Sequence, residues 1–91
     1  FTLSSFYEFE SDKFLIYPNP TKDNITIEFS SIVSDLVIKI YDILAREILT
    51  EKEGKFVNSI EIDLKNLIPG NYIIQLNIDG VVYSDKIIIQ D

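Results

Sequence analysis

The sequence predicts an all-β fold, an antiparallel β-sandwich of about seven short strands. Apolar and polar residues alternate with a period of two in one segment after another, as in strands with one buried and one wet face. Turn signals separate these segments, and no stretch carries the period of an amphipathic helix over three turns. A chain of 91 residues can bury one core, and a sandwich covers one face of every strand.

The first expected strand is the apolar run from Phe14 to Tyr17. Pro18-Asn19-Pro20 ends it, because proline cannot donate to a ladder. Residues 1–13 mix serine, acidic and aromatic residues without a strict period, so we expect a linker-like segment that adds at most one short edge strand. The domain itself is assigned to residues 14–91. We expect the two prolines to stiffen the entry between the linker and the first strand and to present the linker segment in extended form.

The remaining strands follow from the alternation. They are expected at residues 25–29, 36–41, 46–50, 60–64, 72–78 and 83–90. In the strand at 46–50, Ile48 is the best core candidate. Residues 30–36 are expected to hold a helical turn at most.

Turn chemistry agrees with this division. Asp79-Gly80 between two alternating runs predicts a type I′ hairpin turn, which needs positive φ at both central positions. Pro69-Gly70 predicts a type II turn, in which proline is followed by a residue with positive φ. Polar turns are expected at residues 21–24 and 52–55.

Composition restricts the function. With 8 basic and 15 acidic residues the net charge is −7, so we expect no binding to nucleic acid. Apolar runs of a few residues are far shorter than the roughly 20 of a membrane helix, so no direct membrane insertion is expected. The absence of Cys and His removes thiol chemistry, the usual general base and the usual zinc ligand. We therefore expect no catalysis, cofactor or metal, and, since the chain begins at Phe1, we expect a processed product or a segment excised from a longer protein.

Three other kinds of site stay open as alternatives. Glu61 and Asp63 share a strand face, but a glycosidase needs two carboxylates across a cleft, and surface acids are usually just solvated. Loop aspartates could hold a structural calcium ion, although no segment has EF-hand spacing. A sugar-stacking platform could be built from Tyr41, Phe56 and Tyr83, although aromatic residues in strands more often pack in the core.

Some apolar residues fall on strand faces that should be wet; they are Val37, Tyr41, Ile73, Val82 and Ile88. They form a docking patch if their strands are neighbours, or are scattered surface residues if they are not. The last strand is apolar on both faces, so it could also pair with a partner or with a second copy by strand addition.

Four blocks of the sequence resemble the C-terminal sorting domains of the type IX (Por) secretion system, type A family. They occur in the family's order, and they are Tyr17 to Phe29, Val37 to Ile48, Ile62 to Leu76, and Lys86 to Gln90. The resemblance implies an Ig-like sandwich at the C-terminus of a cargo protein. It marks as recognition positions Tyr17, Pro18, Asn19, Pro20, Asp42, Pro69, Gly70, Tyr72, Lys86, Ile87, Ile88 and Ile89.

The resemblance also implies a function. The domain would direct its cargo from the periplasm through the secretion machinery and across the outer membrane to the cell surface or the medium. A sortase-like peptidase would then remove it, at or before residues 1–13, or exchange it for a surface anchor. The alternative is an accessory adhesion or carbohydrate-binding module of an extracellular hydrolase.

Two departures from the family pattern stand out. Ala45 replaces the glycine of the central turn, and we expect another turn geometry there because alanine tolerates positive φ poorly. The chain ends in Gln90-Asp91 instead of a basic residue.

Overall fold

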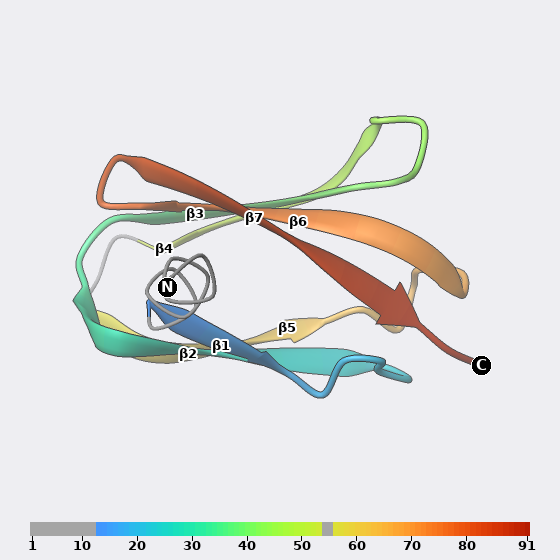
Figure 1. Ribbon diagram of the computed structural model, residues 1–91, viewed down its shortest axis with the longest axis horizontal. Coiled ribbons are helices and arrows are strands. Elements are labelled where there is room, and N and C mark those ends of the chain that lie inside the picture. The colour runs from blue at the N-terminus through green and yellow to red at the C-terminus, as the bar shows by residue number, and fades with distance from the viewer. Residues whose placement is uncertain (1–12, 54–55) are drawn as a thin grey trace, which may run out of the picture.

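The computed structural model describes residues 13–53 and 56–91 and shows two stacked β-sheets (Figure 1). One sheet has the strand order β1-β2-β5 and the other the order β4-β3-β6-β7, and all neighbouring strands are antiparallel. Over the described residues the strands are β1 (Phe14–Tyr17), β2 (Asn24–Val33), β3 (Leu36–Tyr41), β4 (Glu47–Glu53), β5 (Val57–Asp63), β6 (Gly70–Ile78) and β7 (Val81–Ile89).

The predicted sandwich of about seven strands is therefore confirmed. The prediction of a linker with a short edge strand falls on residues 1–12, which lie outside the described residues. In the part of the chain that the structure describes, no helix is long and apolar enough to cross a membrane.

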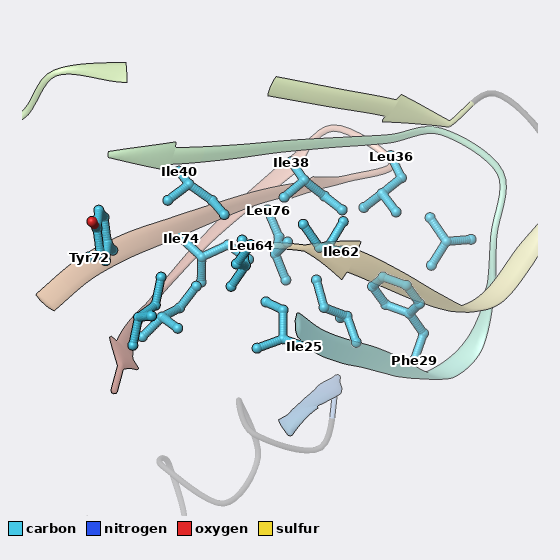
Figure 2. Packing of buried hydrophobic residues seen from close by; sticks show 14 residues of the cluster. Ile25, Phe29, Leu36, Ile38, Ile40, Ile62, Leu64, Tyr72, Ile74 and Leu76 are labelled. Carbon is cyan, nitrogen blue, oxygen red and sulfur yellow. The ribbon is translucent and has the colours of Figure 1, made fainter. Parts of the chain in front are cut away.

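The core lies between the two sheets and is built from the inward-facing residues of both (Figure 2). Directly paired residues on neighbouring strands point to the same face, so the pairing of Ile38 with Leu76 places both side chains inside. The buried apolar residues are Ile25, Ile27, Phe29, Val33, Leu36, Ile38, Ile40, Ile62, Leu64, Tyr72, Ile74, Leu76, Ile87 and Ile89.

β2 extends further than the sequence predicted. Its pairing with β5 runs regularly from Asn24 to Glu28, shifts register, and resumes where Val33 pairs with Val57. This register shift points the Val33 side chain into the core. The strand therefore continues through residues in which buried and exposed side chains no longer alternate. Residues 30–36 were expected to hold a helical turn at most, and the structure agrees with this limit, because residues 30–33 belong to β2 and Leu36 begins β3.

The core residue of β4 is Leu49 and not Ile48. A register shift between Ile40 and Tyr41 pairs Ile40 with Leu49 and Tyr41 with Glu47, so Ile48 is the extra residue of a β-bulge. Leu49 packs against the core, while Ile48 is 37% exposed. Alternation alone misplaced this position, because the extra residue of a bulge shifts by one which residues of the strand face the core.

The two predicted glycine turns differ in outcome. Asp79 and Gly80 have φ values of 50° and 91° between β6 and β7, which confirms the positive φ that a type I′ hairpin needs. Gly70 has a φ of 157°, close to extended, and is the first residue of β6. A type II turn needs a φ of about 80° there, so that prediction is wrong.

Different turns and strand ends lie at the two ends of the sandwich. At the end that we call proximal, the described chain begins: the carbonyl of Lys13 accepts a hydrogen bond from the Ser30 amide at 3.1 Å. The β6–β7 turn lies at the same end, where the Asp79 amide donates to the Asp35 carbonyl at 2.8 Å. At the opposite, distal end β2 and β6 begin and β3, β5 and β7 end (Figure 1).

Candidate functional site

Four segments that are far apart in the sequence meet at the distal end. β1 ends there, and residues 17–21 run on beside the end of β7. The β3–β4 turn at residues 42–46 and the β5–β6 connection at residues 64–69 lie at the same end, because Tyr41 pairs with Ile73 and Gly70 with Ile89. This convergence makes the distal end the candidate functional site.

Asn19 connects the first of these segments to the last. Its side-chain Nδ2 donates to the carbonyl of Lys86 at 2.8 Å, and its Oδ1 accepts from the amide of Ile88 at 3.0 Å. One amide side chain thus matches the donor and acceptor pattern of a free strand edge across 67 to 69 residues of sequence. Asn19 acts as a clamp on the closing strand.

Thr21 extends the clamp by backbone pairing. Its amide donates to the Ile88 carbonyl at 2.9 Å, and its carbonyl accepts from the Gln90 amide at 2.7 Å, as in a short parallel bridge. Its hydroxyl donates to the Asn24 carbonyl, and the residue is only 2% exposed. The outer edge of β7 is therefore already bonded from Lys86 to Gln90, and an added strand would find this part of the edge occupied.

The prolines lie inside this clamp and not at the junction with the linker. Pro18 and Pro20 are exposed, follow β1, and are each preceded by a cis peptide bond. The expectation that they stiffen the passage from the linker into the first strand is wrong, because β1 precedes them and brings the chain across the sandwich to the distal end.

The β3–β4 turn is held by Asp42. The carboxylate Oδ1 accepts from the amides of Leu44 at 2.9 Å and Arg46 at 3.0 Å, and Oδ2 accepts from Arg46 Nε at 2.8 Å. The backbone bonds from Ala45 to Asp42 and from Asp42 to Arg46 close a three-residue loop. Such a loop needs its last residue in the left-handed region, where glycine is usual.

Ala45 occupies that left-handed position with a φ of 64°. The expectation that alanine forces another geometry is therefore wrong. The strain of a Cβ at positive φ, typically about 1–2 kcal/mol, is accepted because the surrounding bonds to Asp42 determine the loop.

The same bonds perturb the acidity of Asp42. The Arg46 amide, ahead of the Arg46 guanidinium and the Leu44 amide, holds the pKa of the Asp42 carboxyl below its usual value. These donors favour the charged form and outweigh the partial burial that opposes it. Asp42 is thus an ionised structural group at neutral pH.

Tyr72 organises the β5–β6 connection. Its ring is buried in the core, and its hydroxyl donates to the carbonyl of Ile68 four residues earlier. This contact resembles the tyrosine corner of Ig-like sandwiches, in which a tyrosine hydroxyl fixes a connection to the strand that follows it. A second bond, from the Leu67 amide to the Leu64 carbonyl at 3.0 Å, tightens the start of the connection.

Between these two loops lies a hollow of about 630 Å³, which we call the distal groove. Three apolar side chains at its margin are strongly exposed: Ile43 by 77%, Leu44 by 66% and Ile68 by 77%. The groove is lined by Asp42, Ile43, Leu44, Arg46, Ile48, Asn66, Leu67, Ile68, Pro69, Gly70, Asn71 and Tyr72. The sequence pattern alone did not indicate this surface, because it forms from two loops.

The two acidic residues considered for catalysis lie on the surface of a single strand. Glu61 and Asp63 share one exposed face of β5, where Glu61 accepts from Asn24 Nδ2 and Asp63 from the Lys65 amide. Across residues 13–53 and 56–91, no three acidic side chains gather closely enough to hold a metal ion. Asp79 bonds to the Ser34 hydroxyl and the Asp35 amide, which closes the proximal end.

The aromatic residues considered for a sugar platform are separated. Tyr83 packs toward the core and meets Phe14 edge to face, with ring centroids 5.6 Å apart. Tyr41 pairs with Ile73, which is exposed on the outer face of the sheet that also contains Tyr83, and Phe56 lies in the β4–β5 connection. These three side chains therefore form no common stacking surface.

The apolar residues predicted on wet faces do lie on neighbouring strands, since β3, β6 and β7 are adjacent. Tyr41 pairs with Ile73 near the distal end, whereas Asn77 separates Val37 from Val82 near the proximal end. A polar row of Lys39, Gln75 and Ser84 lies between the two groups. They are thus two small groups and not one continuous patch.

Comparison with known families decides the class of the protein. The family model of the secretion system C-terminal sorting domain matches residues 15–90. The chain belongs to this family. The domain is thus the sorting signal of type IX secretion cargo, and it directs that cargo to the cell surface or the extracellular space. A search of the curated proteins found no match.

The positions that the resemblance marked for this sorting domain all lie at the distal end. Asn19, Asp42 and Tyr72 make the hydrogen bonds that hold its segments together. In the closing strand, Ile87 and Ile89 are buried, Ile88 is half-buried, and Lys86 is exposed. The recognition role of these residues stays a prediction, and Thr21 is a structural member of the site that the sequence did not reveal.

Proposed function

We propose that this sorting domain is read by the secretion machinery as a folded surface, through its distal end and without catalysis of its own. The observation that supports the proposal is the meeting of four distant segments at one end of the sandwich. A linear signal would not require residues 17–21 to contact residues 86–90. A surface signal would require it, because its parts are positioned only by folding.

The periplasmic step and the removal of the domain belong to the same proposal. The cargo would cross the periplasm with the domain already folded, since the signal exists only in the sandwich. A sortase-like peptidase would cut before β1, whose first residue lies at the end of the domain opposite to the reading surface. Self-association by strand addition to the closing strand would have to use Val81–Asp85, the part of the β7 edge that Asn19 and Thr21 leave uncovered.

The test is a reporter with an inner-membrane signal peptide, fused in front of residues 1–91 and expressed in strains with and without the type IX machinery. We expect surface or extracellular reporter only when the machinery is present. The variant Ile74→Asp places a charge at a fully buried core position and should unfold the domain. It should leave the reporter in the periplasm.

Export of the Ile74→Asp fusion at the unmodified level, with unfolding verified by circular dichroism of the isolated variant, would contradict a folded signal. Mass spectrometry of the exported reporter tests removal: a mature end before Phe14 supports the peptidase, and an intact domain at the surface contradicts it. Immunoblots of the periplasmic fraction confirm that the variant fusion is present in comparable amount.

A further inference from the structure

We propose that the distal groove is the docking site for a short apolar loop of the secretion machinery. This inference rests on the proposed function and specifies which part of the distal end the partner contacts. It begins from three side chains, Ile43, Leu44 and Ile68, which are exposed by 77%, 66% and 77% at the margin of one hollow.

The position of these side chains is unusual for turns. Tips of hairpin loops normally carry Gly, Asn, Asp or Ser, which suit the backbone and the solvent. In the β3–β4 loop Asp42 supplies the turn chemistry by bonding to the Leu44 and Arg46 amides. The loop tip is therefore free to carry Ile43 and Leu44, whose side chains are mostly exposed and bury little area within the domain.

Ile68 faces the same hollow from the other loop. Its carbonyl is held by the Tyr72 hydroxyl, so the backbone beneath the exposed side chain is anchored to the core. Both walls of the groove are thus fixed by bonds to buried or paired groups. A preformed apolar surface of this kind binds without a large ordering cost.

The charge of the groove indicates the chemistry of the partner. The whole chain carries a net charge of −7, but at the groove Asp42 and Arg46 form an ion pair at 2.8 Å. The other polar residues of its lining, Asn66 and Asn71, are uncharged. A basic partner would find little here to attract it, whereas apolar side chains flanked by peptide groups fit both walls.

The place of the groove decides among possible occupants. The described chain begins at the proximal end, so the groove lies at the end of the sandwich opposite to the start of β1. Three side chains offer roughly a few hundred Å² of apolar area, well below the about 800 Å² per partner of a stable dimer. A brief contact with a transport component suits this size, since cargo must be released again.

The experiment uses the reporter fused to residues 1–91, with Leu44→Asn or Ile68→Asn in the groove. The matched control is Ile32→Asn, which changes an isoleucine exposed by 63% near the proximal end of β2. Loss of one buried aliphatic contact corresponds to about a tenfold or larger loss of affinity. We expect each groove variant to lower export by about tenfold or more, and the control to export as the unmodified fusion does.

Photo-crosslinking gives an independent readout in cells. A photoreactive phenylalanine at position 68 should give an adduct with a protein of the machinery, absent in the strain that lacks it, whereas the same residue at position 32 should not. Thermal unfolding of the isolated variants should match the unmodified domain, because the replaced side chains are exposed.

The two proposals fail separately. An unmodified fusion that is not exported overturns the proposed function. Export of the unmodified fusion with equal export of both groove variants overturns the docking site alone, and so does equal loss of export in the Ile32→Asn control. Adducts of equal strength from positions 32 and 68 would also overturn it.

Discussion

Replacing Asn19 by alanine should loosen the closing strand by a predictable amount. The side chain makes two hydrogen bonds to β7, with the Lys86 carbonyl at 2.8 Å and the Ile88 amide at 3.0 Å. Both lie at an exposed edge, where water replaces part of what is lost, so each contributes about 0.5–1.5 kcal/mol. Asn19→Ala should therefore lower the free energy of unfolding by about 1–3 kcal/mol, which is roughly 4–24 °C in Tm for a domain of this size.

The matched control is Asn58→Ala, which truncates an exposed asparagine of β5 that carries no such clamp. It should change Tm by less than about 3 °C, as surface substitutions usually do. Urea unfolding and amide hydrogen exchange by NMR measure the effect. Exchange at Ile88 should accelerate more than at Ile87, whose neighbour across the sheet is Tyr72. An unchanged Tm together with unchanged exchange at Ile88 would refute the clamp.

Three further predictions concern the turn and the core. Ala45→Gly should raise the free energy of unfolding by about 0.5–1 kcal/mol in urea unfolding, because relief of left-handed strain exceeds the added chain entropy; a loss of stability would show that the loop is not under strain. Asp42→Asn tests the lowered pKa of that carboxyl. Because the pKa is lower in the folded than in the unfolded state, the ionised carboxylate stabilises the fold. This stabilisation is present above a pH of about 4 and is lost as the pH falls through the folded pKa. The Tm difference between unmodified domain and variant should be largest near neutrality and shrink toward zero in acid, and a difference independent of pH would contradict this. Ile74→Ala should cost about 2–5 kcal/mol in urea unfolding, whereas Ile73→Ala, on the outside of the same strand, should cost much less; equal costs would contradict the assigned inward face.

The sequence allowed most of the sandwich to be predicted because period-two alternation depends only on neighbouring residues. It failed where the period is interrupted. The bulge in β4 moved the core position from Ile48 to Leu49, and the irregularity in β2 concealed the return of Val33 to the core. A register shift leaves no mark in composition, so alternation misleads by one position beyond it.

The sequence indicated many residues of the candidate site but not how they contact one another. Asn19 and Ile88 were both marked by resemblance, but their contact spans 69 residues and leaves no local pattern. Ala45 shows a second limit, since a residue that disfavours positive φ adopts it when Asp42 fixes the loop around it. Local preference predicts the usual conformation, and tertiary bonds can override it.

Three of the polar positions that carry the family resemblance are engaged in holding the distal end together. Asn19 bonds to β7, Asp42 closes a turn, and Tyr72 anchors a loop, so each of these polar groups already has a partner inside the domain. The side chains left free to meet another protein are their neighbours, such as Leu44 and Ile68. It follows that substitutions of Asn19, Asp42 and Tyr72 should impair export in proportion to lost stability, whereas substitutions of Leu44 and Ile68 should impair export at unchanged stability. Measuring export and the free energy of unfolding on the same variants distinguishes residues that hold the domain together from residues that contact the partner.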